Sequence, residues 1–189
     1  MRVRIFSVLL LMAGIVSSSQ AADQAVIDAI KNAGGLALPH PGKGDQWEVE
    51  FHLRGRELAD EGLKHVAALK NVVVLNLRDT QITSAGLVHL KGLAKLRRLH
   101  LERTQIDDEG IGNLAGLGDL EYLNLYGTKI TDKALDQLTD LKNLKQLYVW
   151  QTGVTEEGAD KLKKVLPGVK VVRGIDLSKV VVVKKPEPK

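Results

Sequence analysis

The sequence contains no cysteine, and only seven of its 189 residues are aromatic. Without cysteine the chain has no disulfide framework, no thiol nucleophile and no thiolate ligand for a metal. Only two serines, Ser84 and Ser178, follow residue 21. Ser84 comes directly after a predicted helix cap, and no histidine or aspartate is placed to activate it as a nucleophile. We therefore expect no enzymatic activity and no cofactor.

The charge is balanced where the fold is expected. The chain carries 27 basic and 23 acidic residues, and its pI is about 9.2. Leaving out residues 1–21 and 176–189 removes six basic and two acidic residues, so that 21 of each remain. A nucleic-acid-binding domain carries its basic excess on the folded body. The composition therefore argues against nucleic acid as a partner.

The N-terminal segment 1–21 has the order of a secretory signal peptide. Arg2 and Arg4 precede an apolar run over residues 5–16, and the small residues of Ser19-Gln20-Ala21 follow it. The run is shorter than the roughly 20 residues that a membrane-spanning helix needs. We predict cleavage after Ala21, an extracytoplasmic location (periplasmic or secreted), and no stable membrane insertion after cleavage. An uncleaved membrane anchor is the alternative.

The dominant feature of the sequence is a 24-residue repeat. In the unit 72–95, Leu75 and Leu77 alternate with polar residues, which is typical of a strand with one buried face. Leu87, Leu90 and Leu93 then recur at every third position, which indicates a short helix. The strand pair recurs as Leu75/Leu77, Leu99/Leu101, Leu123/Leu125 and Leu147/Val149. A fixed period of this length predicts a solenoid whose neighbouring units share one core.

This unit resembles the leucine-rich repeat family. It is most similar to the 24-residue bacterial type found in planctomycetes, with threonine at the turn position. The match covers Phe51 to about Gly174, with degenerate units at both ends. The resemblance implies an α/β fold, a right-handed solenoid with a curved parallel sheet on its concave side and short helices on its convex side. It also implies a protein-binding function.

Three further columns repeat with the same period. A turn threonine is predicted to bond to the backbone of its own coil and of the next one: Thr80, Thr104, Thr128 and Thr152. A second column supplies predicted helix N-caps: Thr83, Asp107, Thr131 and Thr155. A third column holds small residues where a side chain is predicted to meet the neighbouring coil: Gly62, Gly86, Gly110, Ala134 and Gly158.

The ends of the chain depart from the repeat. Residues 23–33 are predicted to form a short amphipathic helix that covers the end of the solenoid, residues 36–45 a loop, and residues 47–53 the first strand. That strand is expected to carry Trp47, Val49, Phe51 and Leu53 on one face. We divide the chain into a signal peptide (1–21), a capping helix and loop (22–46), a solenoid of about six coils (47–175) and a C-terminal tail (176–189). The tail is interpreted as solvated, with attachment to a surface as the alternative.

The histidines do not form a metal site in this arrangement. His52 and His100 share a strand column but lie two coils apart, so that their side chains start roughly 10 Å from each other. Zinc needs ligands about 2 Å from one centre. His65 and His89 lie on adjacent coils of the helical side without a third ligand in their column. No metal site is therefore predicted.

The residues between the leucines are expected to face outward on the concave side. They form three columns: Glu50, Val74, Arg98, Tyr122, Gln146 and Lys170; His52, Asn76, His100, Asn124, Tyr148 and Val172; and Arg54, Arg78, Glu102, Tyr126, Trp150 and Gly174. Four of the six aromatic residues that follow residue 21 fall in these columns, all in the fourth and fifth units. Tyr126 and Trp150 are neighbours in one column, so their rings can stack on each other or flank a ligand.

Exposed aromatic residues beside arginines are typical of binding hot spots. The alternative, that aromatic residues simply favour strands, does not explain their concentration in two units. The predicted partner-binding residues are Arg78, Arg98, His100, Glu102, Tyr122, Tyr126, Tyr148 and Trp150. The first hypothesis is recognition of a protein. The second is binding of a glycan or cell-wall polymer, because tyrosine and tryptophan rings also stack on sugars.

Overall fold

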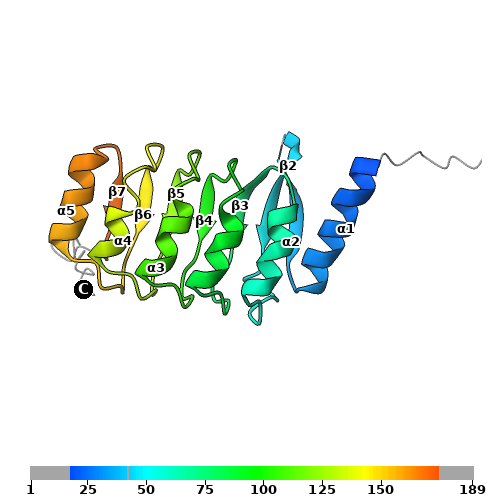
Figure 1. Ribbon diagram of the computed structural model, residues 1–189, viewed down its shortest axis with the longest axis horizontal. Helices are drawn as coiled ribbons and strands as arrows, with labels where there is room; N and C mark the ends of the chain where they lie inside the picture. Colours follow the sequence, from blue (N-terminus) through cyan, green and yellow to red (C-terminus); the bar gives the residue numbers. More distant parts are fainter. Residues whose placement is uncertain (1–17, 42, 175–189) are drawn as a thin grey trace, which may run out of the picture.

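The protein is built as one sheet with a row of short helices along it (Figure 1). The computed structural model describes residues 18–41 and 43–174. Its seven strands lie in one sheet in chain order, and every neighbouring pair is parallel except the first. The strands are β1 (Leu36–His40), β2 (Lys43–Glu50), β3 (Val72–Asn76), β4 (Arg98–His100), β5 (Tyr122–Asn124), β6 (Gln146–Tyr148) and β7 (Lys170–Val172). The predicted fold class, a leucine-rich repeat solenoid, is confirmed.

The strand register reproduces the period of the sequence. Leu75, Leu99, Leu123 and Leu147 are direct partners in β3 to β6, and the side chain of each is fully buried. Their neighbours along each strand point to the opposite face of the sheet, because successive side chains in a strand alternate. The leucines thus form a continuous core between the sheet and the helices, while the intervening columns face outward.

In several coils the helix on the helical side is a 3₁₀-helix, which is wound more tightly than an α-helix. The helices are α1 (Ser18–Asn32), η1 (Asp60–Gly62), α2 (Leu63–Ala68), η2 (Ser84–Leu90), α3 (Asp108–Ile111), η3 (Gly112–Leu114), α4 (Asp132–Asp136) and α5 (Glu156–Val165), where η marks a 3₁₀-helix. The recurrence of leucine at every third position is compatible with this geometry, because a 3₁₀-helix completes one turn over the same interval. The coil of α4 has the same leucine spacing and forms an α-helix. In η2 the 3₁₀ geometry buries Leu87 and Leu90 completely.

The turn threonines bond within their own coils. The hydroxyl of Thr104 donates to the carbonyl of Leu101 at 2.8 Å, and the hydroxyl of Thr128 donates to that of Leu125 at 2.7 Å. Thr80 and Thr152 make the same bond to the residue three positions earlier. The predicted bonding role is confirmed for the residue's own turn. The predicted bond to the next coil is wrong: each hydroxyl donates its one proton within its own coil, and in the described part of the chain none of the four accepts a hydrogen bond from the next coil.

The helix caps, in contrast, make side-chain bonds between coils. The four predicted N-cap residues each accept a hydrogen bond from a backbone N–H of their own helix. Three of them also bond to an aspartate of the preceding coil: Thr83 to Asp60, Thr131 to Asp108 and Thr155 to Asp132. Each of these three caps therefore satisfies a helix end and ties two coils together.

The glycine column is confirmed as a close contact between coils. A Cβ atom on Gly110 would lie 2.8 Å from the Cα atom of Ser84 in the preceding coil. On Gly86 and Gly158 it would lie 2.3 Å and 2.1 Å from carboxylate oxygens of the preceding coil. Gly62 differs, because its nearest neighbour is Leu58 of its own coil. The helices can approach each other because these positions carry no side chain.

The N-terminal end departs from the prediction. The segment 36–45, expected as a loop, forms β1 and the start of β2, which pair as an antiparallel hairpin at the edge of the sheet. Pro39 is tolerated there because an edge strand can lack one backbone donor. The predicted helix is confirmed in α1, which extends to Asn32 and is followed by Gly34 with φ +83°. Ile30 of α1 is fully buried, so the helix covers the first coil.

The first coil also has a different register. Val49 of β2 pairs with Leu75, although the period of the sequence assigns Phe51 to that place. Glu48, not Glu50, is therefore the partner of Val74. β2 ends at Glu50, and Leu53, expected on the buried face, is 66% exposed. The chain leaves the sheet before Leu53 can reach the core.

The segment 1–17 of the predicted signal peptide and the tail 176–189 lie outside the described residues. α1 begins at Ser18, so this helix crosses the predicted cleavage position after Ala21. Within residues 18–41 and 43–174, no helix is both long enough and apolar enough to cross a membrane.

Candidate partner-binding face

The outward side of strands β3 to β7, here called the strand face, brings most of the predicted site residues together. Tyr122 of β5 and Tyr148 of β6 have ring centroids 5.4 Å apart, and the ring of His100 lies 4.8 Å from that of Tyr122. Tyr126 and Trp150 stack with centroids 5.3 Å apart and an interplanar angle of 28°. The four predicted aromatic residues thus form two contacting pairs on one surface.

Arginines cover these rings. The guanidinium carbon of Arg98 lies 4.5 Å from the ring centroid of Tyr122, and that of Arg103 lies 5.2 Å from the ring centroid of Tyr126. Both distances are within the range of cation–π attraction. Arg103 was not among the predicted site residues. It directly follows the third column and has φ +55°, so its backbone turns and returns the side chain to the strand face.

The signal for this turn was present in the repeat. Asp79, Arg103, Gly127 and Gln151 stand one period apart, and all four have positive φ. Aspartate and glycine are residue types that tolerate this conformation. The period therefore marks a left-handed turn at the end of each strand segment, which is the local feature that places Arg103.

Glu102 does not lie where it was expected. The prediction that its side chain is exposed is wrong, because the residue is only 6% exposed. Its Oε1 atom accepts a hydrogen bond from Nδ1 of His100 at 2.9 Å and one from Nδ2 of Asn124 at 2.7 Å. Neighbouring side chains of the strand face thus cover the Glu102 side chain, and its charge is not exposed at the surface.

Arg78 is also part of a local charge cluster. Its Nε atom donates to Asp79 at 3.2 Å, and Arg103 approaches the same carboxylate at 3.6 Å. Arg103 also donates to the hydroxyl of Tyr126 at 3.4 Å. One aspartate thus holds two arginines at the rim of the stacked aromatic pair.

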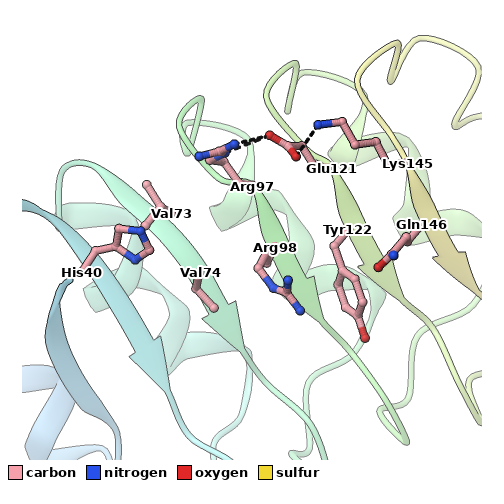
Figure 2. A pocket seen from close by; sticks show the side chains of 9 residues that line it. All are labelled: His40, Val73, Val74, Arg97, Arg98, Glu121, Tyr122, Lys145 and Gln146. Carbon is pink, nitrogen blue, oxygen red and sulfur yellow. Dashed lines mark hydrogen bonds and ion pairs between the residues drawn. The ribbon is translucent and has the colours of Figure 1, made fainter. Parts of the chain in front are cut away.

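Two cavities open on the strand face. The first, of about 300 Å³, lies near the start of the strands (Figure 2). It is lined by His40, Val73, Val74, Arg97, Arg98, Glu121, Tyr122, Lys145 and Gln146. The second, of about 440 Å³, lies toward the end of the strands, beside the stacked pair. It is lined by Arg78, Glu102, Arg103, Asn124, Tyr126, Tyr148, Trp150, Val172 and Gly174.

An ion triad that the repeat pattern does not indicate runs along the edge of the first cavity. Figure 2 shows Glu121 between Arg97 and Lys145. Lys145 donates to Glu121 at 2.7 Å, and hydrogen bonds from Lys145 and Arg97 lower the pKa of the Glu121 carboxyl below its ordinary value. Nearby, burial raises the pKa of the Tyr122 hydroxyl. The edge of this cavity is thus basic, with one acidic group shared by two cations.

Ser84 has an acidic neighbour, contrary to the prediction that no aspartate is placed beside it. Its hydroxyl donates to the carboxylate of Asp107 in the next coil at 2.5 Å, and it accepts a bond from the backbone N–H of Asp107 at 3.0 Å. The hydrogen bond from the hydroxyl lowers the pKa of the Asp107 carboxyl. Oδ1 of Asp107 accepts hydrogen bonds from both the Ser84 hydroxyl and the backbone N–H of Glu109, so the pair joins two coils and caps α3.

No group of three potential metal-ligating residues comes together in the described part of the chain.

Two repeats match a family model. Residues 68–90 and 92–115 match the model described as leucine-rich repeat. No curated protein sequence matches the chain. These two matches, together with the fold, support a place for the chain among the leucine-rich repeat proteins.

The comparison with solved structures matches proteins from a plant and from bacteria. The ectodomain of the receptor kinase SOBIR1 from Arabidopsis thaliana is 17% identical, with a TM-score of 0.50 over 81% of this chain and 91% of that one. Internalin C2 from Listeria monocytogenes is 30% identical, with a TM-score of 0.49 over 58% of this chain and 44% of that one. A leucine-rich repeat protein of Leptospira interrogans is 22% identical, with a TM-score of 0.42 over 57% and 33%. The chain therefore spans less than half the length of either bacterial protein.

Proposed function

We propose that this leucine-rich repeat solenoid is an exported binding module that recognises a protein partner through its strand face, the side predicted to be concave. The observation that carries this proposal is the stacked pair of Tyr126 and Trp150 with arginines around it. Trp150 is 42% exposed although it is a large apolar residue. Clustered aromatic residues and arginines are enriched at the centres of protein interfaces.

The test is capture of envelope proteins by the purified protein, followed by affinity measurement with the captured partner. Replacing Trp150 with alanine should weaken binding by at least about 2 kcal/mol, as hot-spot aromatic residues do. The melting temperature should stay nearly unchanged, because the ring lies at the surface.

Lys163 supplies the control for this experiment. It is exposed on α5, on the helical side, where it bonds to Asp160 of the same helix. Its replacement by alanine should change neither binding nor melting. A Trp150 variant that binds normally and melts much earlier would identify the ring as a packing residue and remove the basis of the site.

The extracytoplasmic location is a separate part of the proposal, and it rests on the order of residues 1–21. Sequencing the N-terminus of exported material should give Ala22 as the first residue. Recovery of chains that begin at Met1 from the membrane fraction would support the anchor alternative instead.

Glycan binding is the second candidate function, and the cavity beside Trp150 favours it. Its volume of about 440 Å³ lies in the range of small-molecule sites. The two candidates predict different footprints. Replacing Arg98, which lies near the other cavity, should weaken binding of a protein that covers the whole strand face, but it should leave a glycan in the second cavity unaffected.

A further inference from the structure

Arg98 is an exposed cation in the first cavity whose charge is not matched by a carboxylate. Its guanidinium carbon lies 4.5 Å from the ring centroid of Tyr122, and Figure 2 shows the two side chains together in this cavity. In the described part of the chain, the Arg98 side chain forms no hydrogen bond or ion pair with an acidic residue. Because the ring contacts the face of the guanidinium, the N–H groups at its edge remain available to an acceptor.

The charged side chains that line the first cavity leave it with a positive excess. Arg97, Arg98 and Lys145 are basic, and Glu121 is the one acidic residue among the lining residues, so three positive charges against one negative charge give a formal net charge of +2. Arg97 and Lys145 both bond to Glu121, which holds these two cations beside the cavity. Residues 22–175 as a whole carry 21 basic and 21 acidic residues, so the excess is local.

The walls of the cavity indicate what kind of anion fits. Val73 and Val74 line it together with Tyr122, so part of the wall is apolar. His40, on the same wall, already bonds to Glu48 at 2.6 Å. A small inorganic anion leaves the apolar surface uncovered, whereas the methylene groups of an acidic side chain can cover it. A polyanion such as nucleic acid requires an extended basic surface, which the balanced charge of the folded body does not supply.

Tyr122 connects this cavity to the aromatic cluster of the strand face. Its ring centroid lies 4.8 Å from that of His100 and 5.4 Å from that of Tyr148. A protein that packs on these rings therefore reaches Arg98 within the same contact. Protein interfaces commonly surround an aromatic centre with polar and charged contacts that determine which partner is accepted.

We propose that the first cavity receives a carboxylate side chain from an acidic segment of the partner protein, with Arg98 as the residue that binds it. Arg97 and Lys145 add to the attraction, and Glu121 limits it by offsetting part of their charge. A guanidinium can donate two parallel hydrogen bonds to one carboxylate, which adds directional specificity. The proposal rests on the proposed protein recognition through the strand face, and it names the chemistry of the partner at one position.

The experiment titrates the ¹⁵N-labelled full chain with a capped peptide of six glutamates and, separately, with the matched peptide of six glutamines. The glutamate peptide should shift the backbone amide signals of β4 and β5 and the side-chain Nε–Hε signal of Arg98, and the glutamine peptide should not. Arg98→Gln should weaken binding of the glutamate peptide at least tenfold. The matched control is Arg56→Gln, the same substitution at an exposed arginine that lines neither cavity, which should leave the affinity unchanged.

A second variant changes the affinity in the opposite direction. Glu121→Gln removes the one negative charge that lines the cavity while nearly preserving the size of the side chain. It should strengthen binding of the glutamate peptide by about threefold or more, because the carboxylate of the peptide then meets a larger positive excess. A general loss of stability does not produce this pattern, since one substitution lowers the affinity and the other raises it.

Inorganic phosphate and galacturonic acid are the competing anions in the same titration. If either shifts the β4 and β5 signals and the glutamate peptide does not, the cavity binds phosphate or an acidic sugar and the proposal fails. It also fails if millimolar glutamate peptide causes no shift, if Arg98→Gln binds the peptide normally, or if Glu121→Gln binds it more weakly. If capture of a partner protein still depends on Trp150 in these cases, protein recognition stands and only the acidic contact falls.

Discussion

The carboxylate of Asp132 in one coil accepts two hydrogen bonds from Thr155 in the next. The backbone N–H of Thr155 donates to Oδ1 at 2.8 Å, and its hydroxyl donates to Oδ2 at 2.7 Å. Asp108 and Thr131 repeat this arrangement one coil earlier, at 2.7 and 2.6 Å. The helical side of the solenoid is therefore joined by a ladder of charge-assisted bonds that follows the period of the sequence.

Replacing Asp132 with alanine should lower the free energy of unfolding by about 1–3 kcal/mol, since hydrogen bonds to a charged group contribute more than neutral ones. Urea unfolding measures this change. The control is Asp140→Ala at an exposed position of the same coil, which should stay within about 0.5 kcal/mol. Equal losses in the two variants would mean that the ladder does not stabilise the fold.

Acid should weaken the same contacts. Hydrogen bonds from Ser84 to Asp107 and from Thr155 to Asp132 lower the pKa of both carboxyl groups in the folded protein. A group with a depressed folded pKa contributes stability that is present above its unfolded pKa, near 3.9 for aspartate, and that is lost as the pH falls through the folded pKa. Urea unfolding from pH 6 to pH 2.5 should show this loss below about pH 4.

The double variant Asp107→Asn, Asp132→Asn provides the control for the acid experiment. Asparagine does not titrate, so the unfolding free energy of the variant should depend less on pH than that of the original protein. A difference between the two proteins that stays constant over the whole range would show that these carboxyl groups are not responsible.

The same leucine substitution should have different consequences at two positions. Leu101 is fully buried in a central coil, and its replacement by alanine should cost about 2–5 kcal/mol, because it leaves a cavity in the shared core. Leu53 is 66% exposed, and its replacement should cost less than about 0.5 kcal/mol. Thermal and urea unfolding of the pair measure the difference, and comparable losses would refute the assignment of Leu53 to the surface.

Two glycines allow a similar comparison on the helical side. Gly110→Ala should destabilise the protein by about 1–3 kcal/mol, because the new Cβ atom would lie 2.8 Å from the Cα atom of Ser84 and force the coils apart. Gly118→Ala meets no atom within 4 Å and should be neutral or slightly stabilising. Melting temperatures that fall equally would mean that coil spacing does not depend on Gly110.

The 24-residue period of the sequence predicted much of the architecture. Strand faces, cap residues and the glycine column follow from local chemistry that recurs in every unit, so one unit predicts the others. Part of β2 was predicted as the first strand, but the hairpin with β1 was missed because residues 36–45 lie outside the repeat, and Pro39 and Pro41 are typical of loops. The 3₁₀ geometry of η2 agrees with leucine at every third position, although the sequence alone also allowed an α-helix.

For the candidate site, the sequence by itself determined which side chains share the strand face, because the alternation along each strand and the fixed repeat leave one outward set. The stacking of Tyr126 on Trp150 and the nearness of Tyr122 and Tyr148 follow from that set. Only the tertiary structure decided that Glu102 is buried and that the first coil is out of register with the others. The burial of Glu102 depends on side chains from adjacent coils that share its hydrogen bonds, and the register of the first coil depends on how β2 pairs with β3. A repeat pattern considered one column at a time contains neither relationship.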